Sequence, residues 1–266
     1  MNPLRLSLIQ SHVHWEDAVR NLEHFTGHVQ QLTSPTDVVV LPEMFATGFT
    51  MNTALALDMN SAPVDWMLDW ASRLNALVMG SLPIRDASGT YNRLLMAFPN
   101  GTLQHSDKRH CFRMADEHVH YQPGTERKVV QWRGWNLLPL VCYDLRFPVW
   151  SRNRWSLEKG YEYDVVLYPA NWPQRRSLAW QRLLPARAIE NQCYCVGVNR
   201  VGDDGYGVHY EGHSGVWNYL GESLAPFAPE QEGWLHATLD GQALIDYRKA
   251  FPAGMDADAF RLENLS

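Results

Sequence analysis

The sequence predicts an α/β fold in a layered α+β arrangement, with mixed sheets that are covered by helices. Three observations lead to this prediction: β-branched runs typical of buried strands, helical segments between them, and two signals for antiparallel hairpins. The chain has no Pro/Gly/Ser-rich linker, charge run or low-complexity segment. We therefore expect one domain over residues 1–266.

The first third of the chain has the order strand, helix, strand, helix, strand. Leucines alternate with polar residues over residues 4–8, which predicts a half-buried strand, and apolar residues at steps of three and four predict a helix over residues 15–32. Residues 37–43 form a β-branched run typical of a strand covered on both faces. A helix over residues 63–75 and a strand over residues 77–82 follow by the same criteria.

Two hairpins are predicted in the middle of the chain. The Asn-Gly pair at 100–101 separates strands over residues 91–98 and 102–105, and it is the strongest short-range hairpin signal in the chain. Strands over residues 129–132 and 135–142 flank a second tight turn. These strands make the sheets mixed rather than purely parallel.

The second half repeats the alternation of strands and helices. Residues 164–169 and 193–199 form strands on either side of a helix over residues 177–191, which Pro185 is expected to bend or break. The last fifteen residues or so show no clear periodicity. The remaining predicted elements are a turn over residues 202–205, strands over 214–220 and 234–239, and a helix over 243–251.

Composition narrows the classes of function. The chain has 266 residues with 23 Lys and Arg against 29 Asp and Glu, a net charge of −6, which gives no basic footprint for nucleic acid. The four cysteines provide no disulfide framework and favour a reducing compartment. Neither a signal peptide nor an apolar run of membrane-spanning length is present, so we expect a cytoplasmic protein that binds neither nucleic acid nor membrane.

Phosphate and metal motifs are weak in this chain. No glycine-rich loop has the spacing of a phosphate-binding motif. Three pairs of metal-ligand residues lie two positions apart: His12 and His14, His118 and His120, Cys193 and Cys195. None of these pairs has the spacing of a familiar zinc site, so we expect no metal.

A thiol, an amine and a carboxylate form the remaining candidate constellation. Cys142 ends a buried-type strand where the chain turns toward a helix, a position that holds a nucleophile rigidly and exposes it to a cleft. Glu43 closes an apolar strand, where a carboxylate must be paired or used. Lys108 follows a hairpin strand. Taken singly, Cys142 also fits an inert core cysteine, and Lys108 fits a solvated surface lysine.

The segments around these residues closely resemble the three catalytic segments of the nitrilase superfamily of carbon-nitrogen hydrolases, and they occur in the same order. They read Leu-Pro-Glu43, Asp-Lys108-Arg-His and Val-Cys142-Tyr-Asp-Leu-Arg-Phe-Pro. The resemblance covers nearly the whole chain and is strongest to the omega-amidase branch. Further matching segments are Gln10, Tyr91-Asn92, Pro123-Gly124, residues 186–192, residues 198–202, His213-Ser214-Gly215 and Gly221-Glu222.

The resemblance implies a four-layer α-β-β-α sandwich, a homodimer, and amide hydrolysis through a Cys thioester without a cofactor. Cys142 is then the nucleophile, and Glu43 carries the proton from thiol to leaving ammonia and later activates water. Lys108 is expected to lower the thiol pKa and to stabilise the oxyanion together with the backbone N–H of Tyr143. Glu117 matches a further carboxylate of the family's amidases and is expected to orient Lys108 and the amide nitrogen.

The implied substrate is a small 2-oxo acid omega-amide, 2-oxoglutaramate or 2-oxosuccinamate. Its free carboxylate requires a cation, and four arginines near matching segments are candidates that the sequence does not rank: Arg113, Arg146, Arg175 and Arg176. The sequence departs from the family at Cys111, which stands at a usual Leu position, and at residues 168–172, which form the expected wall of the acyl pocket. Asn171 and Trp172 are therefore further candidates for substrate contact.

Two other functions are compatible with the same residues. The Glu43, Lys108 and Cys142 chemistry also suits an N-carbamoyl amino acid, another aliphatic amide or a nitrile. The second alternative is not an enzyme but a binding protein with the same fold and a catalytically silent site. Such a protein would not require all of these catalytic residues.

Overall fold

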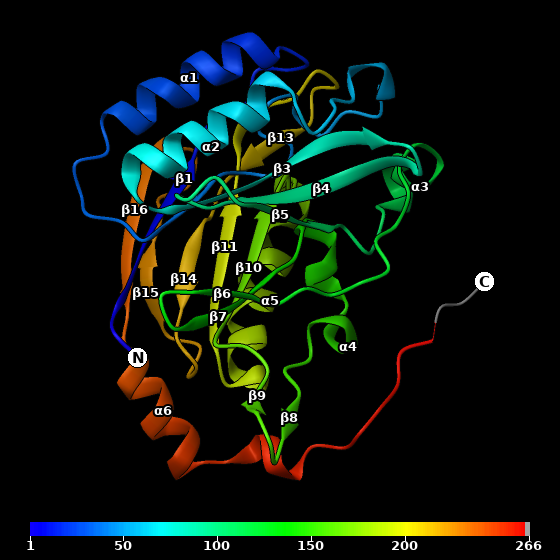
Figure 1. Cartoon of the computed structure of the whole chain (residues 1–266). Coiled ribbons are helices and arrows are strands. Elements are labelled where there is room, and N and C mark those ends of the chain that lie inside the picture. The colour runs from blue at the N-terminus through cyan, green and yellow to red at the C-terminus, as the bar shows by residue number, and fades with distance from the viewer. Residues whose placement is uncertain (264–266) are drawn as a thin grey trace.

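Two six-stranded sheets packed face to face form the centre of the computed structural model, which describes residues 1–263 (Figure 1). The first sheet has the strand order β16-β1-β2-β3-β4-β5. Strands β1, β2 and β3 run parallel, whereas the others pair antiparallel. The bounds are β1 Leu4–Gln10, β2 Val38–Val40, β3 Leu77–Asp86, β4 Gly89–Ala97, β5 Leu103–Asp107 and β16 Gly233–Leu239.

The second sheet has the strand order β15-β14-β11-β10-β7-β6. Its central strands β7, β10 and β11 are parallel, and antiparallel strands flank them. Both sheets are therefore mixed, as predicted. The bounds are β6 Val130–Trp132, β7 Trp135–Pro139, β10 Val165–Ala170, β11 Tyr194–Asn199, β14 Gly215–Trp217 and β15 Ser223–Pro226.

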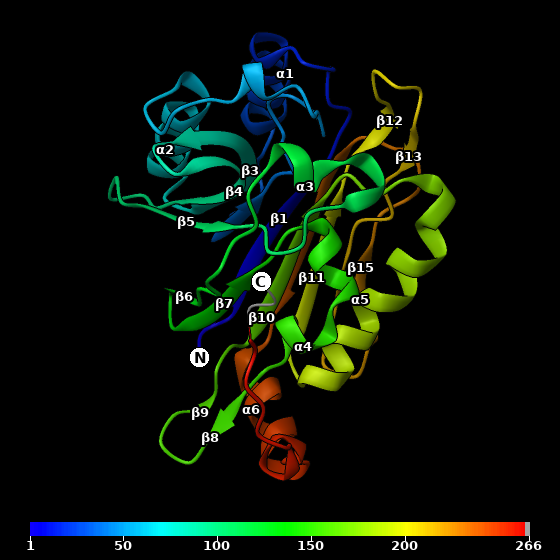
Figure 2. The same ribbon diagram turned by 90° about the vertical axis from the view of Figure 1, so that its right-hand side faces the viewer.

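Helices cover both outer faces, which confirms the α-β-β-α layering (Figure 2). Helices α1 (Ala18–Gln30) and α2 (Ala62–Leu74) bury apolar side chains such as Phe25 and Met67 against the first sheet. Helix α5 (Ser177–Asn191) covers the second sheet with Trp180 and Leu184. Since the inner faces of the two sheets share one apolar cluster, each sheet is buried on both sides.

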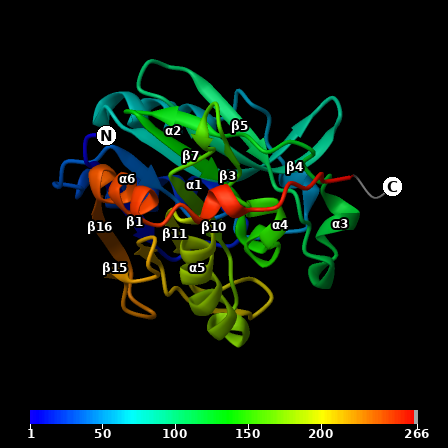
Figure 3. The same cartoon turned by 90° about the horizontal axis from the view of Figure 1, so that it is seen from below.

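The remaining helices and strands lie outside the two six-stranded sheets and the three helices that cover them. Helix α6 (Gly241–Ala250) is at the lower end, where the C-terminal segment also runs (Figure 3). The others are α3 Glu117–His120, α4 Pro148–Ser151, β8 Trp155–Ser156, β9 Gly160–Tyr161, β12 Val201–Asp203, β13 His209–Glu211, and the 3₁₀ helices Thr53–Leu55, Arg113–Ala115, Cys142–Arg146, Gln174–Arg176 and Ala253–Asp256.

Helix α5 continues through Pro185, so the helix does not break there. The helix lies close to β11: a Cβ on Gly197 would come within 2.5 Å of the Leu184 side chain. This packing of Leu184 and Trp180 stabilises the helix although Pro185 has no backbone N–H to donate.

Other differences concern the ends of strands. The strand predicted up to residue 142 ends at Pro139, and the turn predicted over residues 202–205 begins later because β12 extends to Asp203. Residues 257–263 form no helix or strand, in agreement with the missing periodicity, and residues 264–266 lie outside the described part of the chain. Within residues 1–263, every helix is too short or too polar to cross a membrane.

Candidate active site

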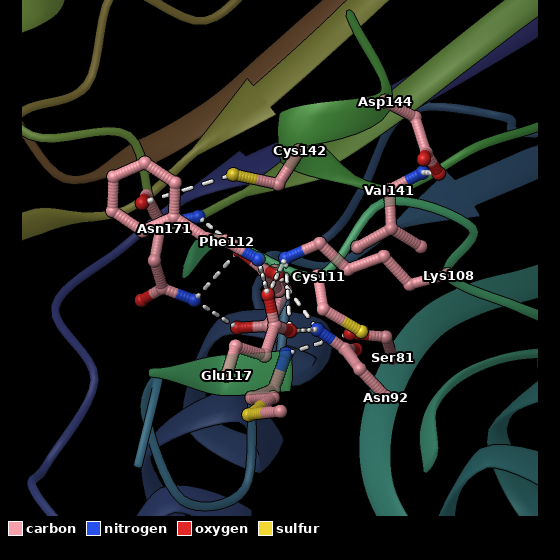
Figure 4. A network of polar contacts seen from close by, with 12 residues as sticks. Ser81, Asn92, Lys108, Cys111, Phe112, Glu117, Val141, Cys142, Asp144 and Asn171 are labelled. Carbon is pink, nitrogen blue, oxygen red and sulfur yellow. Dashed lines mark hydrogen bonds and ion pairs between the residues drawn. The ribbon is translucent and has the colours of Figure 1, made fainter. Parts of the chain in front are cut away.

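A cavity of about 270 Å³ lies where strand ends of both sheets meet. Glu43 and Lys108 come shortly after strands of the first sheet, and Cys142 and Asn171 after strands of the second. Their side chains converge on one region, in which Figure 4 labels Lys108, Cys142 and Asn171. The sandwich therefore brings together residues that lie far apart in the sequence.

Glu43 is fully buried, and its carboxylate accepts hydrogen bonds from three other segments of the chain. Oε1 accepts from Asn92 Nδ2 at 2.7 Å and from Lys108 Nζ at 2.9 Å, and Oε2 accepts from the backbone N–H of Asn171 at 2.7 Å. The next residue, Met44, has a positive φ of 46° and donates its N–H to Ser81 Oγ on β3. These bonds hold the carboxylate in one orientation.

Lys108 directly follows β5, and its backbone N–H donates to the carbonyl of Asn92 on β4. The backbone N–H of Gly124 donates to the Lys108 carbonyl. The two segments lie so close that a Cβ on Gly124 would be 2.2 Å from the carbonyl oxygen of Asp107. Only glycine fits there, which explains the Pro123-Gly124 pair. The alternative of a solvated surface lysine is excluded, because Lys108 is 2% exposed.

Two carboxylates surround the Lys108 ammonium. Nζ lies 2.9 Å from Glu43 Oε1 and 2.9 Å from Glu117 Oε2. Burial alone lowers the Lys108 pKa, but the charges of Glu117 and Glu43 outweigh it and raise that pKa well above its ordinary value. The ammonium therefore stays charged.

Glu117 begins α3 and is also fully buried. Its carboxylate accepts from Lys108 Nζ, from the backbone N–H of Phe112 at 2.5 Å, and from Asn92 Nδ2 at 3.3 Å. Burial raises the pKa of Glu117, and Lys108 acts in the opposite direction. The expected contact between Glu117 and Lys108 is thus present. Glu117 is not a solvent-exposed carboxylate of a loop.

Cys142 begins a 3₁₀ helix just after β7. Its backbone φ is 44°, and a positive φ is unusual for a residue other than glycine. Asp144 holds this turn, because its carboxylate accepts from the backbone N–H groups of Val141 and His110. The Sγ atom lines the cavity and lies 3.8 Å from the carbonyl oxygen of Asn171. Strain of this kind is stored where the surroundings over-determine the backbone.

Lys108 lowers the pKa of the Cys142 thiol, as expected, but other groups outweigh it and the net shift is upward. Burial raises the thiol pKa, Glu43 raises it further, and the opposing effect of Lys108 is smaller, so the pKa lies well above the ordinary value. The resting thiol therefore keeps its proton. A base must take this proton when the sulfur attacks.

The arginines differ in a way that the sequence does not reveal. Arg146, Arg175 and Arg176 line the cavity, and Arg113 is exposed and outside that lining. Arg146 stacks over Trp172 at 5.0 Å, and Arg176 stacks over Phe112 at 5.4 Å.

Of the four candidate arginines, Arg176 is best suited to bind an anionic ligand. Its Nη1 atom is buried and makes no hydrogen bond to any described residue. Burial and the neighbouring charges of Arg175 and Arg146 lower its pKa. An anion in the cavity would relieve both effects.

Asn92 and the positioning role of Asn171 were not predicted. Asn92 bridges Glu43 and Glu117 from β4, and Asn171 bonds both the carboxylate and the backbone of Glu43. Asn171 and Trp172 both line the cavity, in agreement with their choice as candidates. The sequence signal for Asn92 was the Tyr91-Asn92 segment, which matches the family on the strand before the Lys hairpin.

Comparisons with known proteins agree with this geometry. A family model described as carbon-nitrogen hydrolase matches residues 5–249. Omega-amidase YafV of Escherichia coli (strain K12) is 50% identical over 262 residues, which are 98% of this chain and 100% of the relative. A 2-oxoglutaramate amidase of Bacillus subtilis (strain 168) is 30% identical over 93% of this chain and 95% of its own length.

A solved structure extends the similarity to three dimensions. XC1258 from Xanthomonas campestris, a CN-hydrolase superfamily protein with an arsenic adduct in its active site, superimposes with a TM-score of 0.96. It is 44% identical, and the comparison covers 99% of this chain and 100% of that one. The resemblance inferred from the catalytic segments is thereby confirmed, and the chain belongs to the carbon-nitrogen hydrolase family of the nitrilase superfamily.

Proposed function

We propose that the protein is an omega-amidase, which hydrolyses the terminal amide of 2-oxoglutaramate or 2-oxosuccinamate to the 2-oxo dicarboxylate and ammonia. The observation that carries this proposal is the buried Lys108 ammonium between Glu43 and Glu117, beside a strained thiol in a cavity lined by arginines. Relatives named omega-amidase and 2-oxoglutaramate amidase support the same substrate class.

The first half of the reaction forms a thioester on Cys142. Glu43 removes the thiol proton as Sγ attacks the amide carbon, since the resting thiol pKa is raised and no thiolate is stored. The carbonyl oxygen becomes an oxyanion, which the Lys108 ammonium and the backbone N–H of Tyr143 stabilise. Protonated Glu43 then donates its proton to the amide nitrogen, the C–N bond breaks, and ammonia leaves.

The second half returns the enzyme to its initial state. Glu43 takes a proton from water, the resulting hydroxide attacks the thioester carbon, and Lys108 again faces the oxyanion. The C–S bond breaks, the dicarboxylate leaves, and the proton held by Glu43 returns to Sγ. Glu117 acts through Lys108, as a positioning residue, because its carboxylate bonds Nζ directly.

The far carboxylate of the substrate would bind at Arg176 and Arg146. The buried Nη1 atom of Arg176 has no protein partner among residues 1–263, and a bidentate pair with a carboxylate would supply one. Arg146 stacks over Trp172, also lines the cavity, and is close enough for its charge to act on Arg176. A substrate without this carboxylate would leave Arg176 Nη1 without a hydrogen-bond partner among residues 1–263.

Three further features belong to this proposal: one domain over residues 1–266, a homodimer, and a cytoplasmic location. The family match over residues 5–249 supports the first. Four free cysteines, including the proposed nucleophile, suit the reducing conditions of the cytoplasm. Light scattering of the purified protein tests the dimer.

The test of substrate class compares ammonia release from 2-oxoglutaramate, glutamine, an N-carbamoyl amino acid and a simple aliphatic amide. Glutamine is the matched control, since it differs from 2-oxoglutaramate only in an amino group at the 2-oxo position. We expect a strong preference in kcat/KM for 2-oxoglutaramate over glutamine. A preference for the carbamoyl compound would overturn the assignment while leaving the Cys142 chemistry intact.

A further inference from the structure

Four polar side-chain atoms from three segments converge at a point away from the active-site cavity. They are His24 Nε2 and His28 Nε2 on α1, Glu232 Oε2 just before β16, and Ser11 Oγ just after β1. None of these residues lines the active-site cavity. The two histidines are four residues apart on one helix, so both project from the same face toward the ends of β1 and β16.

The four atoms form a nearly regular tetrahedron. His24 Nε2 lies 3.3 Å from His28 Nε2 and 3.0 Å from Glu232 Oε2, and His28 Nε2 lies 3.6 Å from Glu232 Oε2. Ser11 Oγ lies 2.9 Å from His24 Nε2, 3.5 Å from His28 Nε2 and 3.0 Å from Glu232 Oε2. Ligands about 2.0–2.1 Å from a tetrahedral Zn²⁺ are about 3.3 Å apart, which matches these six separations.

Hydrogen bonds alone do not explain six short contacts. Each imidazole Nε2 carries at most one hydrogen, the serine hydroxyl carries one, and an ionised carboxylate carries none, so at most three hydrogens are present. One central cation, by contrast, contacts all four atoms at once. The chemistry of the ligands is also suitable, because imidazole and carboxylate are common zinc ligands.

We propose that Ser11, His24, His28 and Glu232 bind a divalent transition metal ion, with Zn²⁺ as the ion that this geometry fits. The site is held in place by its surroundings. Glu232 Oε2 also accepts from the backbone N–H of His12 at 3.1 Å, and Trp234 donates to the carbonyl of His28 at 2.9 Å. Such outer contacts orient metal ligands.

The ion would tie α1 to the first sheet. Glu232 and Ser11 sit at the ends of β16 and β1, which pair antiparallel, and the histidines belong to the helix that covers this sheet (Figure 1). The His24 and His28 side chains are 27% and 17% exposed, so an ion can enter from solvent and a chelator can remove it. The role is structural, since the cluster is outside the reaction cavity.

The sequence carries a signal for this site. His24 and His28 have the H-x₃-H spacing, which the closely spaced His and Cys pairs of this chain lack. The pattern predicts two ligands on one helical face, but Ser11 and Glu232 join them only through the tertiary fold. No metal was expected from the sequence, whereas the geometry indicates a metal site at α1.

The experiment is a titration of the full chain, treated with chelator, with Co²⁺ and then Zn²⁺. We use the Cys142→Ala variant as the parent protein, so that the thiol in the active-site cavity cannot bind either ion. We expect one Co²⁺ per chain with the intense visible spectrum of tetrahedral nitrogen and oxygen ligation, displaced by one Zn²⁺. A spectrum identical to that of Co²⁺ in buffer overturns the proposal.

Ligand variants locate the ion. His28→Gln and Glu232→Gln should each weaken Zn²⁺ binding at least ~100-fold and abolish the rise in the midpoint of thermal unfolding that Zn²⁺ produces. Glu23→Gln, an exposed neighbour on the same helix, should bind as the parent does. Parent-like binding by His28→Gln and Glu232→Gln overturns the site. Because the cobalt spectrum is recorded with all four ligands present, it decides even if a variant does not fold.

Discussion

The backbone N–H of Asn171 donates to Glu43 Oε2 at 2.7 Å, and the Asn171 side-chain amide donates to the Glu43 carbonyl oxygen at 2.6 Å. Asn171 directly follows β10 of the second sheet, and Glu43 comes shortly after β2 of the first. This pair therefore couples the two halves of the sandwich at the proposed catalytic base. A base held from both sheets needs little reorganisation during the reaction.

Replacing Asn171 with Ala removes the side-chain bond and leaves the Glu43 carbonyl without that donor. The loss of a buried hydrogen bond of about 1–3 kcal/mol corresponds to a decrease in kcat of roughly 5- to 150-fold if the bond positions Glu43 in the transition state. Steady-state kinetics with 2-oxoglutaramate measure it. Asn153→Ala is the matched control, because Asn153 also bonds buried backbone carbonyls but contacts neither Glu43 nor the cavity. An equal loss of kcat in both variants would assign Asn171 a structural role only.

The raised pKa of Cys142 predicts its alkylation profile. Since burial and Glu43 raise the thiol pKa, the rate of iodoacetamide labelling should still be rising above pH 8.5, the ordinary pKa of a cysteine. Glu43→Gln removes the negative charge, so the midpoint of the labelling profile should move to lower pH although hydrolysis is lost. Mass spectrometry of the labelled peptides measures the extent of labelling in the wild-type protein and in Glu43→Gln. A wild-type midpoint below pH 8 would show a stored thiolate and contradict this mechanism.

The same labelling separates Cys142 from the other thiols. Cys193 and Cys195 are fully buried, and burial raises the pKa of Cys111 to about 12. We expect Cys142 to react first, because it lines the cavity and has Glu43 as a base. If Cys111 is labelled as fast as Cys142, the site does not activate its thiol.

Arg176→Gln should weaken recognition of the substrate carboxylate. Loss of a charged hydrogen bond of about 1.5–3 kcal/mol predicts a decrease in kcat/KM of roughly 10- to 150-fold for 2-oxoglutaramate. A simple aliphatic amide, which has no carboxylate, should lose little. Arg113→Gln is the control, since Arg113 is exposed and outside the cavity lining. Equal losses for both substrates would remove Arg176 from the carboxylate site.

Glu117→Gln should reduce kcat more than it changes KM. Glu117 contacts Lys108 Nζ at 2.9 Å, so its loss allows the ammonium to shift from the position that faces the oxyanion. A misplaced oxyanion donor predicts a decrease in kcat of roughly 10²- to 10³-fold. Kinetics and thermal unfolding are measured together, with the exposed Glu126→Gln as the control. Unchanged kcat in a folded Glu117→Gln protein would contradict the positioning role.

The sequence predicts the layered fold and the catalytic constellation well, because both depend on local patterns. Glu43, Lys108 and Cys142 follow strands whose apolar runs are visible in the chain, and the structure brings them together as expected. Glu117 was predicted from the family resemblance, because it matches a further carboxylate of the family's amidases. Glu43 alone carries its own signal, since a charge at the end of a buried strand is costly unless it is paired or used, whereas the other three were identified through the family resemblance.

Other properties depend on tertiary contacts that no local pattern encodes. The choice of Arg176 over Arg113 depends on which guanidinium group the cavity buries. The raised pKa of Cys142 depends on the burial of the thiol and on its distance from Glu43. The unbroken helix at Pro185 has the same cause, because the packing of Leu184 against Gly197 outweighs the missing backbone hydrogen bond.

The most direct test of the proposed mechanism is the rate of ammonia release from 2-oxoglutaramate by the wild-type protein and by Cys142→Ala. Removal of the nucleophile should lower kcat at least ~10⁴-fold, because no thioester can form. Thermal unfolding shows whether the variant is folded. A folded Cys142→Ala protein that still hydrolyses 2-oxoglutaramate at a rate close to that of the wild type would contradict the central claim.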